Sequence, residues 1–517
     1  MAESRGMEPS QRSRLLVGVC IAAGAAYMQP ATFNYIVTPM LVTFGQNQSS
    51  GALLREVPSI ASLLVIFVAA MTASRFGERR VITAGAILLT LGSALVAAAP
   101  AFGAAVAGLA VQAVGATVLL VVPLGVIGAG FAGRDARATA FAVFSMVSPL
   151  VFVLLPVVAA ALMESSSWRV VAATWVVGGL AALVAGRWAL PPGLSPARTG
   201  GEWWTPMLAG VTCVGLVQAI SHASSDGVLA TSTLLRLAVA VVAAAALVLV
   251  LRHTARPSLD VAMMRRSGVV LLLVAIGLWC FTQLWYYMTL AYEYVYGLSV
   301  LETALLMVPA QACAALGART AGPIVRRRGI TAAGTWLLML TGASLALSAS
   351  VHVSSPLWWP LLVTCLYSYA AVAAGVPMTN ALMDAATPGA EGGASAFRQA
   401  AISVGTVAGI AVISALVFAT FSASISAQLD AAEVPAAEAS QIAQQLRSGA
   451  SAQEVASSYA VPAAEVQVVG EALQRAYLDG MAAHGWAGAV LSALTAGVFV
   501  ASRRLVDRGR RTGAAAR

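Results

Sequence analysis

Lysine is absent from this 517-residue sequence, so all 30 basic residues are arginine. Acidic residues are also scarce: there are only 21, and charged residues make up 10% of the chain against 59% hydrophobic residues. A soluble protein needs more polar residues than this to cover its surface. Together with a mean hydropathy of +0.83, this composition excludes an ordinary soluble protein and indicates an integral membrane protein.

Other scarce features exclude particular kinds of chemistry. The five cysteines lie in separate apolar runs without a close pair, which argues against a disulfide framework or a zinc site. The four histidines form no cluster, and the sequence has no nucleotide-binding glycine loop, H-E-x-x-H zinc motif or G-x-S-x-G nucleophile motif. We therefore expect no metal, no cofactor and no catalytic residues, and the protein is not expected to be an enzyme.

Long apolar runs fill most of the chain. A helix of about 20 apolar residues crosses the ~30 Å hydrocarbon layer of a bilayer. By this measure the sequence predicts an all-α integral membrane protein with fourteen transmembrane helices. The expected spans lie within 15–54, 57–74, 81–133 (two spans), 138–163, 170–186, 203–221, 228–251, 268–290, 300–324, 329–383 (two spans), 395–421 and 481–502.

The arginines indicate how these spans are oriented. Loops that carry many basic residues usually face the cytoplasm. With fourteen spans and a cytoplasmic N-terminus, 24 of the 30 arginines, Arg398 among them, fall on the cytoplasmic side. The other six are Arg55, Arg169, Arg236, Arg319, Arg447 and Arg475. We therefore expect both termini to be cytoplasmic in a multi-pass plasma-membrane protein. The basic charge follows from topology and does not indicate a nucleic-acid partner.

The segment 422–480 between spans 13 and 14 differs from the other loops. It carries seven acidic residues against two arginines, and Ser451 and Glu454 have the spacing of a helix-capping box. Apolar residues recur at helical spacing in its second half. We expect two or three short helices over the outer face, and a solvated spacer is an equal alternative.

Several short motifs carry a family resemblance. Residues 72–80 read T-A-S-R-F-G-E-R-R, and a fainter copy, G-P-I-V-R-R-R-G, occupies 322–329 after span 10. Gln112–Ala116 in span 4 and Leu155–Ala160 in span 5, followed by Trp168-Arg169, match further motifs in the correct order. With Arg398-Gln399 in span 13, the chain resembles the major facilitator superfamily, in its fourteen-span drug:proton antiporter branch.

This resemblance implies a division of the chain into bundles. Spans 1–6 and 9–14 would form two six-helix bundles with spans 7 and 8 inserted between them, and a substrate cavity would lie at the bundle interface near mid-membrane. The expected parts are a cytoplasmic N-terminus (1–14), an N-terminal bundle (15–190), an inserted pair (203–251), a C-terminal bundle (268–502) and a basic cytoplasmic tail (503–517). The motif in the loop after span 2 implies a gating role for Arg75, Gly77, Arg79 and Arg80. We expect a monomer.

The sequence departs from the family pattern at several charged positions. The loop aspartate is replaced by Ser74, its repeat copy by Arg326, the span 4 arginine by Leu109, and the span 1 aspartate by Pro30. In the family these positions serve charge pairs and proton relay. The resemblance therefore predicts the fold and leaves open whether protons drive transport.

Polar residues in the middle of spans are candidates for a substrate cavity, because polar groups at this depth must face protein or water. Span 1 has a proline-broken polar stretch, and span 9 combines aromatic residues with an amide, which suits a bulky amphipathic ligand. The candidate cavity residues are Gln29, Thr32, Asn34, Gln112, Trp279, Phe281, Gln283 and Asn380. For the aromatic residues, ordinary packing or an interfacial belt is the alternative.

Two carboxylates near span ends are candidates for proton coupling. Glu293 ends span 9 at a position where the family branch typically carries glutamine, and Glu56 lies near the start of span 2. A partly desolvated carboxyl at such a place can exchange protons. The alternative is that each is an interface carboxylate in outer water.

These observations predict a secondary transporter that exports an amphipathic or hydrophobic small molecule, with protons as a second partner if transport is coupled. A transporter of lipids or cell-envelope precursors is an alternative, because the outer segment 422–480 could accept such cargo. The third possibility is a membrane sensor or binding protein that kept the fold and lost transport.

Overall fold

The computed structural model describes residues 9–46, 50–131, 134–190, 202–254, 266–386, 391–431 and 463–515. In these ranges the chain forms sixteen helices and no strand. The helices are α1 (Pro9–Thr43), α2 (Gly51–Phe76), α3 (Glu78–Ala97), α4 (Phe102–Gly130), α5 (Arg134–Ser145), α6 (Val147–Ser165), α7 (Trp168–Ala189), α8 (Trp204–Ser225), α9 (Thr231–His253), α10 (Ser267–Trp279), α11 (Leu284–Tyr294), α12 (Val300–Arg328), α13 (Ile330–Ser348), α14 (Trp358–Ala385), α15 (Glu391–Ala431) and α18 (Ala463–Ala515).

These helices contain fourteen segments long and apolar enough to cross a membrane, so the predicted span count is confirmed within the described residues. Two spans are built from two helices each. Span 5 comprises α5 and α6, and Pro149 lies in the first turn of α6, where it cannot donate a hydrogen bond to the preceding turn. Span 9 comprises α10 and α11, separated at Cys280–Gln283 without a proline.

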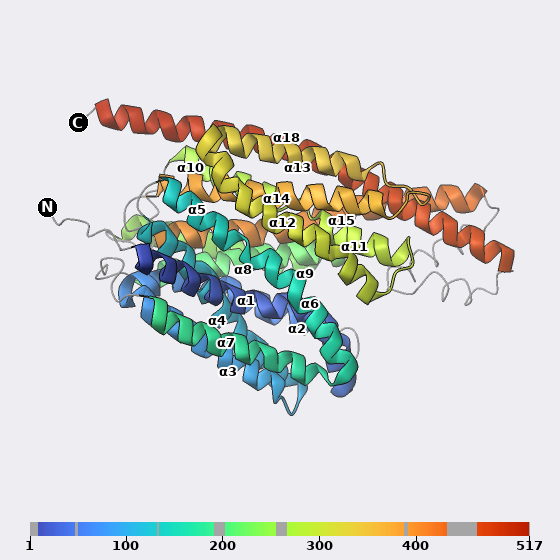
Figure 1. Cartoon of the computed structure of the whole chain (residues 1–517), viewed down its shortest axis with the longest axis horizontal. Coiled ribbons are helices and arrows are strands. Elements are labelled where there is room, and N and C mark those ends of the chain that lie inside the picture. Colours follow the sequence, from blue (N-terminus) through green and yellow to red (C-terminus); the bar gives the residue numbers. More distant parts are fainter. Residues whose placement is uncertain are drawn as a thin grey trace.

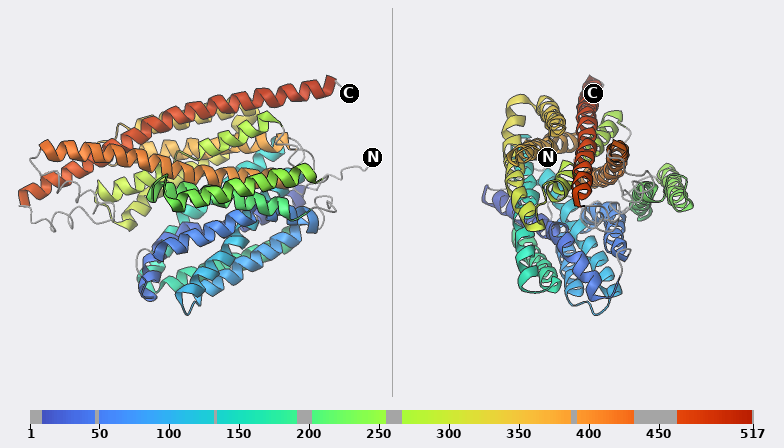
Figure 2. Two further views of the ribbon diagram at one scale, coloured as in Figure 1. Left: turned by 180° about the vertical axis from the view of Figure 1, so that it is seen from behind. Right: turned by 90° about the vertical axis from the view of Figure 1, so that its right-hand side faces the viewer.

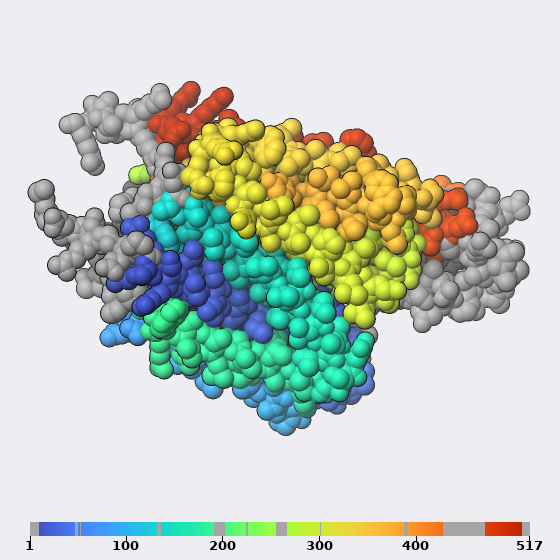
Figure 3. Space-filling model, in the orientation of Figure 1, coloured from blue at the N-terminus to red at the C-terminus, as the bar shows by residue number. Residues whose placement is uncertain are grey.

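The spans are arranged in two bundles (Figure 1). Helices α1–α7 form the N-terminal bundle, and α10–α15 with α18 form the C-terminal bundle. The remaining helices, α8 and α9, pack against each other, and α8 also contacts α2 and α15 (Figure 2). The inserted pair therefore covers a seam between the bundles. Figure 3 shows the second seam, where α5 and α6 meet α12 on the surface.

The same turn joins α2 to α3 and α12 to α13, which shows the internal repeat at the level of the backbone. Gly77 (φ 88°, ψ 141°) and Gly329 (φ 78°, ψ 161°) each end one helix and begin the next. Their N–H groups donate to Ala73 O and Val325 O, in both cases at 2.9 Å. A residue with a side chain is strained at such positive φ values, so glycine suits both turns. The sequence motif and its fainter copy thus form equivalent turns.

The two ends of the molecule differ in charge. Both termini of the described chain lie at one end (Figure 1), together with the loops that carry Arg75–Arg80 and Arg326–Arg328; we call this the basic end. The opposite end, called the far end, carries the turns at 98–101 and 295–299. There α12 begins with a capping box, in which the Ser299 N–H donates to Glu302 Oε2 and the Glu302 N–H donates to Ser299 Oγ.

The hydrophobic core is shared at the basic end and divided at the far end. One cluster near the basic end joins Phe141 and Phe144 of the N-terminal bundle to Met383 and Ala394 of the C-terminal bundle. At the far end each bundle has its own cluster, one around Trp175 and the other around residues such as Tyr292 and Tyr367. The bundles accordingly diverge toward the far end (Figures 1 and 2).

The segment 422–480 is helical where it is described. Helix α15 continues the line of span 13 to Ala431, and α18 begins at Ala463 and continues into span 14. The two helices are joined by a hydrogen bond from Ser424 Oγ to Asp479 Oδ2. The described parts are thus extensions of the two spans rather than separate short helices. Residues 432–462, which include the predicted cap at Ser451 and Glu454, lie outside the described ranges.

Candidate substrate site between the two bundles

Polar contacts close the space between the bundles at the basic end. The carboxylate of Asp384 in α14 lies 3.5 Å from a guanidinium nitrogen of Arg137 in α5, and the Asp384 side chain is 8% exposed. Arg326 Nη1 donates to Thr139 Oγ1 at 3.0 Å, again from one bundle to the other. Arg326, which stands where the family repeat carries an acid, therefore has a partner in the N-terminal bundle.

Close backbone packing supports the same closure. Ser395 Oγ of α15 donates to Val121 O of α4 at 2.6 Å, in a buried position. A Cβ added at Gly125 would lie 3.2 Å from Gly392 Cα, so α4 and α15 approach through two glycines. The contact between α4 and α15 at the basic end is thus tight, and no side chain separates the two helices at these glycines.

The break in span 9 lies inside the C-terminal bundle. Gly405 and Gly409 of α15 pack directly on its backbone, since a Cβ at either position would collide with Gly277 or Phe281. The carbonyl groups freed by the break need partners in a membrane. Tyr367 Oη donates to Thr282 O, and Gln283 Nε2 donates to Cys280 O at 2.9 Å.

The three predicted cavity residues of span 9 are therefore engaged within their own bundle. Trp279 Nε1 donates to Ala371 O at 3.1 Å, the Gln283 amide closes the helix break, and the Phe281 backbone packs on Gly409. All three side chains are half-buried. The structure brings them together around the break in span 9.

The candidates in the N-terminal bundle separate into two groups. Thr32 is buried between α1 and α7, where its hydroxyl accepts from Trp175 Nε1 at 2.8 Å and donates to Met28 O at 2.9 Å. Gln112 is buried where α3 meets α4, its backbone against Gly92. Both side chains are buried.

The remaining polar candidates are less firmly hydrogen-bonded to the protein. Asn34 is exposed, and its Oδ1 accepts a long hydrogen bond, 3.5 Å, from Arg55 Nη2. Gln29 is half-buried one turn earlier on α1. Asn380 of α14 is buried, and its Nδ2 has no hydrogen-bond partner among the described residues.

Arg398 lies deeper than its place among the cytoplasmic arginines implies. It is seven residues into α15, about 10 Å from the helix start at 1.5 Å per residue. Its Nε–H donates to Thr379 Oγ1 of α14 at 2.8 Å, and its guanidinium lies within electrostatic range of Tyr27 and Cys280. The signal was present, because Arg398 falls inside the predicted span 395–421.

A polar cavity of about 230 Å³ lies between both bundles and the inserted pair. It is lined from α2, α4, α8 and α15, and Val217 is the residue that α8 contributes. Its polar lining consists of Ser59, Ser62, Thr117, Gln399 and Ser403. Gln399 belongs to the span 13 motif of the sequence analysis, but the four hydroxyl residues have no assignment there, since single hydroxyls in apolar helices are common and do not form a motif.

The two proton-coupling candidates lie in different surroundings. Glu56 of α2 is 4.0 Å from Nε2 of His222 in α8, so this carboxylate faces the inserted pair. Glu293 is half-buried at the end of α11 and lies within electrostatic range of Tyr35 in α1, across the space between the bundles. Only Glu293 is therefore close to the diverging faces of both bundles.

The predicted gating loop lies at the basic end. Arg79 Nη2 donates to Arg187 O at the end of α7, at 2.8 Å, and Arg80 is exposed. The Arg75 guanidinium lies 5.7 Å from the centre of the Trp203 ring, just before α8. With the turn at Gly77, this loop connects α2 and α3 to both α7 and the inserted pair.

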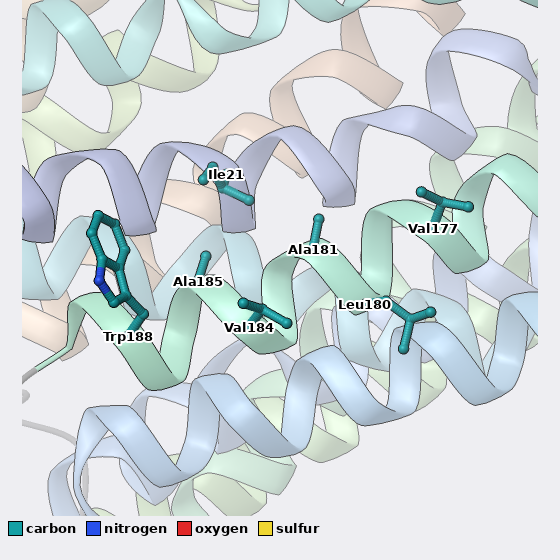
Figure 4. Close-up of a pocket in the computed structure, with 7 residues that line it drawn as sticks. All are labelled: Ile21, Val177, Leu180, Ala181, Val184, Ala185 and Trp188. Carbon is teal, nitrogen blue, oxygen red and sulfur yellow. The ribbon is translucent and has the colours of Figure 1, made fainter.

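A second hollow, of about 470 Å³, is an exposed groove on the outside of the N-terminal bundle (Figure 4). Ile21 of α1 and six residues of α7, from Val177 to Trp188, form it. Except for the Trp188 indole, these side chains carry no polar group. The groove has the character of a lipid-facing surface and offers no group that would orient a polar substrate.

Comparison with known proteins identifies relatives for this arrangement. A family model described as Major Facilitator Superfamily matches residues 16–410. The methyl viologen resistance protein SmvA of Salmonella typhimurium is 28% identical over 254 residues, 48% of this chain and 49% of SmvA, so the match spans about half of each protein. The multidrug resistance protein Stp of Mycobacterium tuberculosis is 25% identical over 380 residues, 72% of this chain and 70% of Stp.

Solved structures support the fold alone. The crystal structure of the human organic anion transporter MFSD10 has a TM-score of 0.61 at 15% identity and covers 95% of this chain and 100% of that one. The proton:xylose symporter XylE has a TM-score of 0.54 at 14% identity, with 77% of this chain and 87% of XylE covered.

Proposed function

Because this chain belongs to the Major Facilitator Superfamily, we propose that it exports an amphipathic or hydrophobic small molecule across the plasma membrane by alternating access. The protein is a multi-pass membrane transporter of that family. Relatives described as methyl viologen and multidrug resistance proteins support efflux of drug-like molecules. The direction of transport, the substrate class and proton coupling are parts of the proposal.

The observation that carries the proposal is the unequal contact between the bundles. They share a core and the Arg137–Asp384 pair at the basic end, and have separate cores at the far end. If the arginine-rich loops are cytoplasmic, this is an outward-facing state. Export then requires the basic-end contacts to break and the far-end faces to meet, so that the site between the bundles opens to each side in turn.

Glu293 is the first candidate for proton coupling, because it lies near Tyr35 of the opposite bundle. A carboxyl there would change its exposure when the bundles close at the far end, which is the property that a coupling group needs. Glu56 is the second candidate, and its His222 contact would make the inserted pair part of the coupling.

The test is transport in inverted membrane vesicles, with and without an imposed pH gradient, using a fluorescent amphipathic probe. A reversible lock comes from a pair of cysteines replacing Thr139 and Arg326, whose side chains meet across the bundles, in a variant whose five native cysteines are alanine. Joining the two cysteines with a bifunctional methanethiosulfonate should lock the basic end and stop transport, and reduction should restore it. Transport that continues in the cross-linked variant would contradict alternating access through this interface.

The orientation has its own test in the same cysteine-free background. A cysteine at Ala101, exposed at the far end, should react with an impermeant thiol reagent added to whole cells, and a cysteine at Ser10 should not. The opposite labelling would reverse the assigned sides and the direction of export.

A further inference from the structure

Arg398 carries a charge that the described part of the protein does not neutralise. Its single hydrogen bond to a described residue is the one from Nε–H to Thr379 Oγ1, and no described carboxylate forms an ion pair with it. Its two Nη atoms form no hydrogen bond with a described residue and are not fully enclosed by other atoms, so they face open space inside the protein. The residue is half-buried by surface area, consistent with this opening.

Other buried arginines have partners, which makes the charge of Arg398 unusual. Arg137 lies beside Asp384, and Arg503 lies 3.8 Å from Asp507. Arg169 donates to Ala99 O at 2.9 Å, and its guanidinium stacks 4.2 Å from the Trp168 ring centre. Each of these charges has a carboxylate, a carbonyl or an aromatic face. Arg398 has one hydroxyl.

The position of Arg398 makes its charge available to a ligand. Thr379 belongs to α14 of the C-terminal bundle, and Tyr27 belongs to α1 of the N-terminal bundle, so the guanidinium lies between the bundles. Tyr27 meets Phe152 of α6 edge-on, with 6.5 Å between ring centres. An anion held by Arg398 would therefore have aromatic surface beside it.

An uncompensated guanidinium within a membrane protein is costly, and such groups face water or a partner. Arginine is also the side chain best suited to bind a planar or tetrahedral anion with two parallel hydrogen bonds. We propose that Arg398 binds the anionic group of the transported molecule, so that the substrates are amphipathic anions such as carboxylates or sulfonates. This inference rests on the proposed function and specifies its substrate class.

The binding test uses two molecules of nearly equal shape. Naphthalene-2-sulfonate carries a full negative charge, and naphthalene-2-sulfonamide is its neutral counterpart. Titration calorimetry on the purified protein in a zwitterionic detergent measures both affinities. The wild type should bind the sulfonate at least about tenfold more tightly, which corresponds to about 1.4 kcal/mol.

The variants test the residue itself. Arg398→Gln keeps a hydrogen-bonding side chain and removes the charge, so sulfonate affinity should fall about tenfold while sulfonamide affinity stays the same. Arg398→Lys should retain most of the preference, because it keeps the charge. Arg236→Gln is the matched control: Arg236 lies in α9 of the inserted pair, where its Nη1 donates to Ser232 O, and its loss should change neither affinity.

Two outcomes overturn the proposal: a wild type without preference for the sulfonate, or an Arg398→Gln variant that loses both ligands equally. If Arg398→Gln does not fold, the wild-type preference and its retention in Arg398→Lys decide. Vesicle transport separates this inference from the proposed function. If the protein binds the sulfonate selectively but transports nothing, only the proposed export is contradicted. If it transports neutral amphipathic molecules without a preference for anions, only the role of Arg398 is contradicted.

Discussion

The two ends of the molecule are held together by different kinds of contact. At the basic end the bundles meet through an ion pair, hydroxyl hydrogen bonds and the facing glycines Gly125 and Gly392. At the far end each bundle is closed around its own aromatic core, and the faces of the two bundles diverge. The contacts between bundles thus combine polar pairs with a shared hydrophobic cluster at the basic end, whereas at the far end each bundle packs only on itself.

This difference indicates where the protein can change shape. Opening the basic end separates the facing helices of the shared cluster and breaks a few polar contacts, while the helices inside each bundle stay packed, so the bundles can move as rigid bodies. The glycines remove bulky side chains from the interface that must open. Four predictions, from the largest expected effect to the smallest, test this comparison.

The largest effect is expected from Asp384→Asn. The substitution leaves the Arg137 guanidinium, which is largely buried, without its carboxylate, and breaking such a pair costs about 3 kcal/mol. The stability of the purified protein should fall accordingly, and the basic end should open more often. Thermal unfolding and labelling of a cysteine at Ser395, which is buried where α15 meets α4, measure the two effects. A stability within about 0.5 kcal/mol of the wild type would show that the pair does not hold the interface.

The next effect is expected from Gly125→Val, which would push α4 away from Gly392. Overpacking at a close contact of this kind costs about 2 kcal/mol. The variant should favour the state that is open at the basic end and should lose transport. Gly103→Val is the control in the same helix, because a Cβ at Gly103 meets nothing within 4 Å. An equal loss of transport in both variants would mean that the close contact between Gly125 and Gly392 is not the cause of the effect.

A smaller effect is expected at the far end from Glu293→Gln, which keeps the shape and removes the charge. Under proton coupling, gradient-driven transport should fall about tenfold, or about 1.4 kcal/mol, while substrate exchange without a gradient continues. Vesicle flux assays measure both. If gradient-driven transport is unchanged, Glu293 is an interface carboxylate and Glu56→Gln is the next variant to measure.

The smallest effect is expected from Arg475→Gln in α18. Arg475 and Glu471 form an exposed pair at 3.0 Å, four residues apart on one helix, and pairs of this kind contribute about 0.3 kcal/mol. Thermal unfolding should hardly change. A loss of stability as large as that of Asp384→Asn would contradict the view that the Arg137–Asp384 pair contributes more than the Arg475–Glu471 pair because it is buried.

Parts of the site could be predicted from the sequence. The turn at Gly77 and its repeat at Gly329 follow from motifs that are local in the chain, whereas the proximity of Glu293 to Tyr35 of the other bundle does not. The role of Thr32 could not be predicted, because its partner Trp175 lies 143 residues away. The cavity lined by Ser59, Thr117 and Ser403 also combines single hydroxyls from separate helices, and none of them forms a pattern in its own segment.

The sequence by itself determined the fourteen spans, because the length of apolar runs and the absence of charge are set by the bilayer and need no knowledge of contacts. The division into two bundles is implied by the family resemblance and not by the apolar runs. Only the tertiary structure decided which polar groups have hydrogen-bond partners inside a bundle and which are available to a ligand. Thr32 and Arg398 are both polar residues within apolar helices. Packing closed the hydroxyl of Thr32 between α1 and α7, and it left the guanidinium of Arg398 open between the bundles.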